Sequence, residues 1–272
     1  MALDLTELAR AAEAGARAGG AIVVAGFDDP SNVREKSPGD WVSDVDTASE
    51  RAIAALLADA APSIPFFGEE SGGTRAELGW ICDPLDGTAN FLHGFPSVGV
   101  SVALVRDGVP IVGVVHAPLL RETYIATLGG GATRDGTPLR VSDRPPANAM
   151  VATGFPFRHQ DLKAPYLDVF GRALFAFEDL RRAGAASMDL AWSAAGVFDG
   201  YFELRLGPWD VAAGALLVRE AGGVVTDWDG NDRTWLETGN IVAAPPAVHS
   251  ALLDLIEKSG IQHSGLPADK IS

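Results

Sequence analysis

One segment, WICDPLDGTANFLHGFP at residues 80–96, most constrains what this chain can be. An apolar run stops at Asp83, Pro84 and Leu85 follow, and Asp86 then precedes a Gly-Thr pair. Neighbouring carboxylates repel each other unless a cation lies between them, and hard divalent cations prefer such oxygen ligands. Pro84 fixes φ and stiffens the bend that aims both acids the same way. The segment therefore predicts a metal site.

The turn after these acids predicts anion binding beside the metal. Gly87 and Thr88 offer backbone N–H groups at a small-residue turn, an arrangement that can hold a phosphate. Thr88 also carries a hydroxyl that could orient an attacking water. Carboxylates for a cation beside amides for an anion indicate metal-assisted phosphate chemistry.

The charge balance narrows the possible partners. The 272 residues include 21 Lys and Arg against 36 Asp and Glu, so the formal net charge is −15. Such a surface disfavours nucleic acid and anionic membranes as unaided partners. An anionic substrate needs local positive charge that the chain barely supplies, and bound Mg²⁺ would provide it.

Length and patterning predict one large domain of mixed layers. Hydrophobic side chains make up 47% of the residues, enough for a sizeable core. Helical and strand-like segments alternate, with hairpins among them, which favours an α/β class. We expect a single domain over residues 1–272, a soft seam near residue 145 and a loosely ordered tail over 259–272. One cysteine, an acidic N-terminus and the lack of a long apolar run predict a cytoplasmic protein without a membrane span.

Three more acids stand at strand ends or helix starts. Asp46 precedes a helix expected to begin at Thr47, Glu69 follows an apolar strand, and Asp210 opens another helix. Ordinary interpretations exist, because Asp46 and Asp210 could cap helices and Glu69 could lie in a solvated turn. Together with the two acids around Pro84, they could hold two or three Mg²⁺ ions. A water activated there could attack phosphorus in line.

Other catalytic signatures are missing from the chain. The residue six positions after Cys82 is Thr88 rather than an arginine, so the loop of a cysteine phosphatase is absent. The sequence has neither a Gly-x-Ser-x-Gly elbow nor a Gly-Lys-Ser/Thr phosphate loop. The five histidines lack metal-ligand spacing, which favours structural roles.

Two long motifs resemble the signatures of the inositol monophosphatase family. DPLDGTANF at residues 83–91 is similar to the first signature, and WDVAAGALLVREAGG at 209–223 to the second. GEES at 68–71, VSDVD at 42–46 and RRAGAASMDLAWSAAGVFDGYFE at 181–203 resemble further family segments. The resemblance covers about residues 5–258. It implies a layered α-β-α-β-α sandwich, a homodimer and a Mg²⁺-dependent phosphatase of a group in which lithium sensitivity is common.

The resemblance also implies which residues hold the metal ions. Glu69, Asp83 and the Leu85 carbonyl match the ligands of a first Mg²⁺. Asp83, Asp86 and Asp210 match those of a second. Glu69 additionally resembles a residue that contacts a third ion through water, which gives it a part in catalysis.

Catalytic and substrate-binding roles follow from the same resemblance. Asp46 and Thr88 match the pair that activates the nucleophilic water, and the Gly87 and Thr88 amides match the phosphate cradle. Glu203 resembles the acid that accepts hydrogen bonds from inositol hydroxyls. Lys36 matches a lysine near the site.

Two departures from the family pattern bear on the substrate. Ala89 stands where many members have a second threonine, but Thr88 keeps the hydroxyl that matters. Ala185 replaces a frequent serine at the substrate edge, which removes one possible hydrogen bond. The second change leaves the chemistry intact and the identity of the substrate open.

The leading hypothesis is a phosphomonoesterase for inositol monophosphate or a similar polyol or sugar phosphate. The same chemistry on fructose 1,6-bisphosphate, a nucleotide 3′-phosphate or histidinol phosphate is the alternative. Glu203 favours a neutral polyhydroxyl group, because a carboxylate accepts hydroxyl protons and repels a second phosphate. A non-catalytic regulatory protein on the same fold is an alternative of another class, and the five retained acids argue against it.

Overall fold

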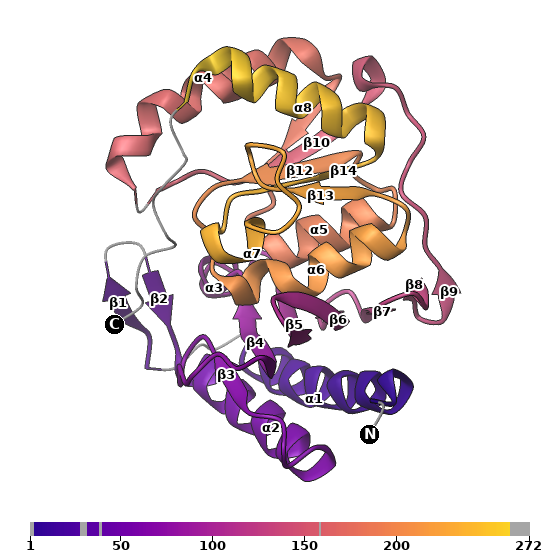
Figure 1. The fold of residues 1–272 in the computed structure, drawn as a ribbon. Helices are drawn as coiled ribbons and strands as arrows, with labels where there is room; N and C mark the ends of the chain where they lie inside the picture. The colour runs from indigo at the N-terminus through magenta and orange to yellow at the C-terminus, as the bar shows by residue number, and fades with distance from the viewer. Residues whose placement is uncertain (1–2, 28–31, 38–39, 158, 262–272) are drawn as a thin grey trace.

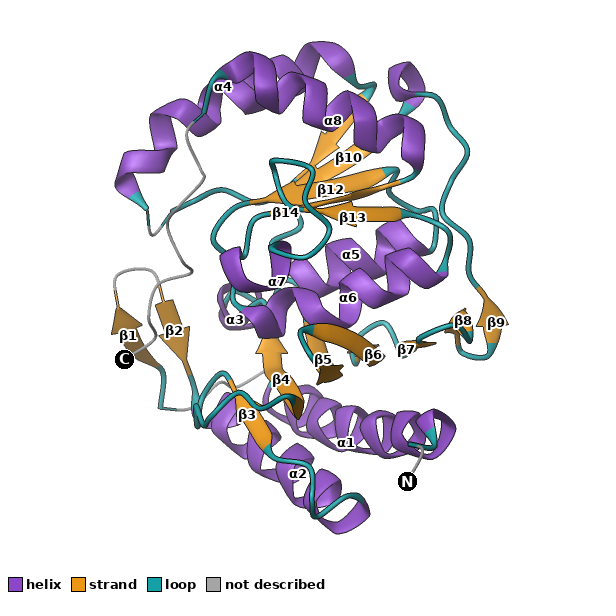
Figure 2. Cartoon of the chain, in the orientation of Figure 1, coloured by secondary structure: helices purple, strands orange, loops and turns teal. Residues whose placement is uncertain are grey.

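The fold is a stack of five layers in which helices and sheets alternate (Figure 1). The computed structural model describes residues 3–27, 32–37, 40–157 and 159–261. A seven-stranded and a five-stranded sheet enclose one pair of helices, and a further pair covers the outer face of each sheet (Figure 2). The expected mixed α/β class and the α-β-α-β-α sandwich are thereby confirmed.

The helices divide among three layers. The paired helices are α1 (Leu5–Gly26) and α2 (Asp44–Ala60) on the seven-stranded sheet, α5 (Ala186–Ala194) and α6 (Pro208–Glu220) in the middle, and α4 (Gln160–Ala176) and α8 (Pro246–Ser259) on the five-stranded sheet. The short helices are α3 (Thr88–Leu92), η1 (Pro146–Asn148) and α7 (Trp235–Thr238). Within the described part of the chain, none of the helices combines the length and apolar character that crossing a bilayer requires.

The larger sheet is built mainly from antiparallel hairpins. Its strands, in spatial order, are β3 (Phe66–Gly68), β4 (Leu78–Asp86), β5 (Gly99–Arg106), β6 (Val109–Ala117), β7 (Glu122–Thr127), β8 (Gly131–Arg134) and β9 (Thr137–Pro138). Only the β3–β4 pair among them is parallel. A hairpin turn at Asp107-Gly108 joins β5 to β6, with φ of 52° and 76° at these two residues.

The smaller sheet mixes parallel and antiparallel pairs. Its strands, in spatial order, are β11 (Asp179–Arg181), β10 (Met150–Thr153), β12 (Gly200–Glu203), β14 (Ile241–Ala244) and β13 (Val224–Thr226). β10 is parallel to both β11 and β12, whereas β14 is antiparallel to β12 and β13. A separate two-stranded ribbon consists of β1 (Arg34–Ser37) and β2 (Asp40–Val42).

Alternation along the strands separates the core into three apolar clusters. On β4, Trp80 and Cys82 pack with the cluster of α1 and α2, whereas Ile81 packs with the cluster of α5 and α6. On β12, Tyr201 belongs to the middle cluster and Phe202 to the cluster under α4 and α8. Both faces of each sheet are therefore buried, which explains why the strands are apolar throughout.

Two element boundaries differ from expectation. The helix expected to begin at Thr47 begins at Asp44, because Ser43 accepts a hydrogen bond from Val45 N and acts as its N-cap. The apolar run expected to stop at Asp83 continues as β4 to Asp86. The chain also passes from the larger to the smaller sheet between Pro138 at the end of β9 and Met150 at the start of β10. The seam predicted near residue 145 falls in this segment. Residues 262–272, most of the predicted loose tail, lie outside the described residues.

Candidate active site

The centre of the site is a cluster of three carboxyl groups, those of Asp83, Asp86 and Asp210. One oxygen from each lies within 4.8 Å of the others. Residues three apart on a regular strand point to opposite faces. The pairing of β4 with β5 shifts register between Asp83 and Asp86, and this irregularity lets both acids meet Asp210 from α6.

The chain orients the two β4 acids through local donors. The backbone N–H of Leu85 donates to Asp83 Oδ1 at 2.9 Å. Ser187, in the first turn of α5, donates its N–H and its hydroxyl to Asp86 Oδ2 at 2.7 and 2.6 Å. One oxygen of each carboxyl group is thus held before any ligand binds. Ser187 was missed by the sequence reasoning, although it lies inside the quoted 181–203 segment.

Two further acids combine a helix-capping role with a place in the site. Asp210 Oδ2 accepts the N–H of Gly207 at 2.6 Å at the start of α6. Asp46 Oδ2 accepts the N–H and the hydroxyl of Ser43 at 2.8 and 2.6 Å at the start of α2. The N-cap residues are Ser43 and Gly207, so the two acids support the helix starts from the third helical position instead of being N-caps themselves, and each keeps a second oxygen for other partners.

Thr88 joins Asp46 to the cluster. Its hydroxyl oxygen lies 3.1 Å from Asp46 Oδ1 and 3.1 Å from the Leu85 carbonyl oxygen. The preceding residue, Gly87, has φ of 86°, a left-handed conformation that turns the chain from β4 into α3. The predicted water-activating pair and the predicted carbonyl ligand are thereby brought together.

Glu69 reaches the site from the loop after β3. Its N–H donates to the Cys82 carbonyl at 3.1 Å, which ties this loop to β4. Lys36 Nζ lies 3.1 Å from Glu69 Oε1 and 2.8 Å from Glu70 Oε1. Burial raises the pKa of Glu69, and the Lys36 charge opposes that shift. Lys36 therefore contacts a predicted metal ligand.

Glu50 supports the same loop and was overlooked as a site residue. Its Oε2 accepts the N–H of Glu70 at 2.8 Å and its Oε1 accepts the N–H of Ser71 at 2.8 Å. Glu50 is buried and lies one helical turn after Asp46 on α2. Two acids spaced four apart on a buried helix face were the signal that could have revealed it.

The electrostatics of the cluster favour a bound cation. Burial raises the pKa of Asp83 and of Asp210 well above the usual carboxyl range, and the charges of neighbouring acids raise it further. Burial also raises the pKa of Asp86 to about 6, although hydrogen bonds from Ser187 oppose the shift. An all-oxygen donor set that repels itself fits a hard divalent cation, which would relieve both the burial and the repulsion.

Of the three predicted substrate residues, Lys36 contacts Glu69 and Glu70, whereas Glu203 and Ala185 come from other elements. Glu203 ends β12, and Ala185 is the buried residue that precedes α5, packed beside Gly87. Burial raises the pKa of the nearby Asp189, and the charges of Glu203 and Asp86 raise it further. Glu203 thus stands next to the acid cluster rather than within it.

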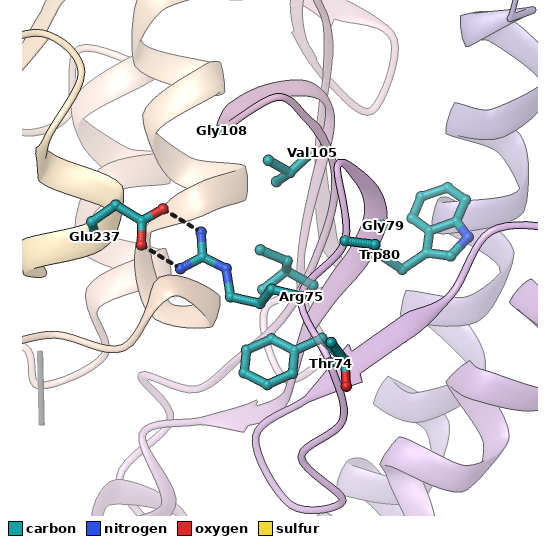
Figure 3. A pocket seen from close by; sticks show the side chains of 10 residues that line it. Thr74, Arg75, Gly79, Trp80, Val105, Gly108 and Glu237 are labelled. Carbon is teal, nitrogen blue, oxygen red and sulfur yellow. Dashed lines mark hydrogen bonds and ion pairs between the residues drawn. The ribbon is translucent and has the colours of Figure 1, made fainter. Parts of the chain in front are cut away.

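A separate cavity of about 340 Å³ lies away from these acids. Phe67, Ile81 and Val105 form apolar walls, and the Arg75 guanidinium makes two 2.8 Å hydrogen bonds to the Glu237 carboxylate across it (Figure 3). This ion pair links the loop between β3 and β4 to α7. None of the predicted site residues lines the cavity.

Fold and site together define a layered α/β protein with a buried acid cluster suited to a divalent cation. The family model described as the inositol monophosphatase family matches residues 4–260. The chain therefore belongs to the inositol monophosphatase family, as its motifs predicted.

Individual relatives agree with this assignment. The chain is 41% identical over 244 residues to Nus factor SuhB of Escherichia coli, covering 88% of this chain and 91% of that protein. The crystal structure of extragenic suppressor protein SuhB from Bartonella henselae matches with a TM-score of 0.88 and 36% identity, over 93% of this chain and 99% of that one. An inositol monophosphatase from Anabaena matches with a TM-score of 0.84 and 32% identity, over 94% and 97% of the two chains.

Proposed function

We propose that the protein is a Mg²⁺-dependent phosphomonoesterase that hydrolyses inositol monophosphate or a similar polyol phosphate. The observation that carries the proposal is the cluster of Asp83, Asp86 and Asp210 beside the Asp46–Thr88 pair. Three like charges in one buried place cost free energy unless a cation binds them. Membership of the family supports phosphate chemistry at such a centre.

The Mg²⁺ ions supply positive charge and Lewis acidity where the chain, with its net charge of −15, has little of either. Oxygen atoms of five residues would hold them, namely Glu69, Asp83, Leu85 through its carbonyl, Asp86 and Asp210. Their geometry is preset, because Leu85 N, Ser187 and Gly207 N hold one oxygen on each of the three clustered acids. Such preorganisation avoids the cost of ordering the ligands when the ion binds.

Asp46 and Thr88 would orient the attacking water. Asp46 directs Oδ2 to Ser43, so that Oδ1 is the oxygen near the Thr88 hydroxyl. A hydroxyl has one proton and two lone pairs, so Thr88 can donate to Asp46 and accept from a water at once. Burial raises the pKa of Asp46, which makes it a stronger base for the proton that this water loses. The Gly87 and Thr88 amides would hold the phosphate.

The substrate side favours a polyhydroxyl alcohol. Glu203 would accept hydrogen bonds from hydroxyl groups, and Ala185 shapes the edge beside Gly87 without a hydroxyl of its own. A second phosphate near Glu203 would be repelled, which disfavours bisphosphates. The inositol monophosphatase from Anabaena, with a TM-score of 0.84, supports the choice of inositol phosphate over the other monoesters.

The test is a substrate panel with and without Mg²⁺. We expect phosphate release from polyol monophosphates only when Mg²⁺ is present. Asp46→Asn should lower kcat by about 100-fold, the effect typical of a lost general base. Asp44→Asn, at an exposed position of the same helix turn, should leave kcat unchanged. The proposal is wrong if no polyol phosphate yields Mg²⁺-dependent phosphate, or if both variants behave alike.

The similarity to a Nus factor favours a second candidate function, regulation through contacts with other proteins. Both functions could reside in one chain, because a protein contact needs no turnover. The discriminating experiment expresses the unchanged protein and Asp86→Asn in a bacterium that lacks SuhB. Restoration of the parent strain's growth by both proteins would favour regulation. Rescue by the unchanged protein alone would favour the phosphatase.

Three further properties belong to the proposal because the family resemblance implies them or the composition predicts them. We expect a homodimer, inhibition by lithium and a location in the cytoplasm. Light scattering, phosphate release in the presence of LiCl and cell fractionation measure these properties in turn.

A further inference from the structure

Glu203 has a buried partner on its own strand. Side chains alternate along a strand, so Tyr201 and Glu203 point to the same face of β12 while Phe202 points to the other. The Tyr201 ring is fully buried in the layer of α5 and α6. Its hydroxyl donates a hydrogen bond to Glu203 Oε2. Burial raises the pKa of Tyr201, as does the charge of Glu203, so the phenol keeps the proton that it donates.

The neighbouring strand supports the same carboxyl group from a second direction. β10 runs parallel to β12 with Thr153 opposite Phe202, which brings Gly154 beside Glu203. A Cβ atom at Gly154 would fall on the Glu203 carboxyl group. The φ of Gly154 is not positive, so this position requires glycine for space and not for its backbone conformation.

The backbone of Glu203 is fixed as well. The indole N–H of Trp228, a buried side chain, donates to the Glu203 carbonyl oxygen at 3.0 Å. Three segments thus fix Glu203. Trp228 holds its carbonyl group, Tyr201 holds its carboxyl group, and Gly154 leaves the space that the carboxyl group occupies. A side chain held in this way loses little conformational freedom when it binds a ligand.

We propose that Tyr201 and Gly154 are positioning residues that hold the Glu203 carboxylate as the acceptor for substrate hydroxyls, and that they thereby set the preference for polyhydroxyl substrates. The inference rests on the proposed phosphatase function and goes beyond it by assigning specificity to two residues that need not contact the substrate. Substitutions at Tyr201 or Gly154 would leave phosphate binding and metal binding unchanged.

The chain contains a matched control. Tyr124 on β7 is also fully buried, and its hydroxyl donates at 2.6 Å to Oε2 of Glu122, two residues away on the same strand. This pair shares the phenol-to-carboxylate bond, the two-residue separation and the buried ring with Tyr201 and Glu203, although Glu122 also lies 3.5 Å from Arg134, and it is in the larger sheet outside the predicted site. Tyr124→Phe therefore reports what losing such a bond does to the fold alone.

The experiment measures kcat and KM of the full chain with Mg²⁺ for two substrates, myo-inositol 1-phosphate and phenyl phosphate, which has no hydroxyl groups. We expect Tyr201→Phe to raise KM for the inositol substrate about tenfold, as loss of a hydrogen bond to a charged group would, with kcat within about twofold. Gly154→Ala should act in the same direction. Neither variant should alter the kinetics with phenyl phosphate, and Tyr124→Phe should alter neither substrate.

A double-mutant cycle separates positioning from general stability. In a Glu203→Ala background, adding Tyr201→Phe should not raise KM for the inositol substrate further, because the group that Tyr201 positions is gone. An equal loss with both substrates, or an additive loss in the cycle, would overturn the inference. So would an unchanged substrate preference in both Tyr201→Phe and Gly154→Ala while the unchanged protein is active. No release from either substrate by the unchanged protein would overturn the proposed function together with the inference.

Discussion

The proposed metal side of the site, at Asp83, Asp86 and Asp210, and the proposed substrate side, at Glu203, differ in what surrounds their carboxyl groups. On the metal side, three carboxyl groups lie within 4.8 Å of one another, and their mutual repulsion adds to the cost of burial. On the substrate side, Glu203 receives a hydrogen bond from a phenol inside its own layer. The first arrangement disfavours the charged form of the acids, and a bound cation would relieve that cost, whereas Glu203 has a hydrogen-bond donor within the chain. Removing residues should therefore harm turnover on one side and selectivity on the other.

The largest effect should come from the metal side. We expect Asp83→Asn to lower kcat on the order of 1,000-fold for every phosphate monoester, because metal-ion stabilisation of the reaction is worth several kcal/mol. Glu203→Ala should instead raise KM for inositol phosphate and leave phenyl phosphate unaffected. Initial rates with both substrates check the contrast. A uniform loss in Glu203→Ala would erase the distinction between the two sides.

The next effect concerns the loop that carries Glu69. Glu50→Ala removes the acceptor of Glu70 N and Ser71 N, so this loop should lose its alignment with the cluster. Residues that orient metal ligands typically matter by 10–100-fold, and we expect the Mg²⁺ concentration for half-maximal activity to rise by about that factor. Glu50→Gln keeps an acceptor oxygen, so its Mg²⁺ concentration for half-maximal activity should lie between those of the unchanged protein and Glu50→Ala. Arg51→Ala, at an exposed position on the same helix, is the control. An unchanged Mg²⁺ requirement in Glu50→Ala would remove Glu50 from the site.

The burial of Asp86 in the cluster should be visible as a pH-dependent response of protein stability to Mg²⁺. The pKa of Asp86 rises from 3.8 to about 6 in the fold, so the metal-free folded state holds this proton more tightly than the unfolded chain. The stability linked to this proton is complete below pH about 4 and is lost as pH rises through about 6, a change of about 3 kcal/mol. Mg²⁺ should offset the loss. Thermal unfolding should therefore show a larger Mg²⁺-induced rise in Tm at pH 7.5 than at pH 4.5, and EDTA should reverse it. An equal rise at both pH values would contradict the account.

The smallest effect should come from the ion pair of Arg75 and Glu237, which lies outside the proposed metal and substrate sides of the site. Arg75 and Glu237 make two hydrogen bonds, yet their side chains keep 31% and 61% of their exposure. Solvent screens such a pair, so Arg75→Ala should lower the free energy of unfolding by about 0.5 to 1 kcal/mol. Activity should be retained. Urea unfolding of Arg75→Ala, Glu237→Ala and the double variant measures the coupling, and a coupling above about 2 kcal/mol would show that this link matters to the fold.

Much of the fold was predictable because it depends on local sequence patterns, namely apolar runs and turn residues. The apolar strands and the Asp107-Gly108 turn indicated the hairpins of the larger sheet, and the helices of both outer layers show apolar stripes. The start of α2 was predicted three residues late, because the sequence alone does not distinguish an N-cap serine from a serine in a loop. Only the structure shows that Val45 N donates to the Ser43 side chain. The role of each site residue remains a prediction that the kinetics above test.

The supporting residues could not be predicted from their spacing alone. Ser187 lies 101 positions from the acid that it holds, and Glu50 lies 20 positions from Glu70. Nothing local marks a serine at a helix start as the partner of a distant aspartate, because the contact depends on how α5 packs against the end of β4. Tyr201 is closer, two positions before Glu203, but an apolar strand gives the same residue a purely packing interpretation.

The family, the class of fold and the acids that could form a metal site were all readable from the sequence, because they depend on motifs that are continuous along the chain. Tertiary structure alone decided that Asp83 and Asp86 share one point with Asp210, since a regular strand would have turned them to opposite faces. It also decided that Glu203 is held by Tyr201 and Gly154, because strand pairing brings a bare Cα beside the carboxyl group. The motif around Pro84 predicts a metal site, and the packing of the two sheets around α5 and α6 brings the residues of that site together.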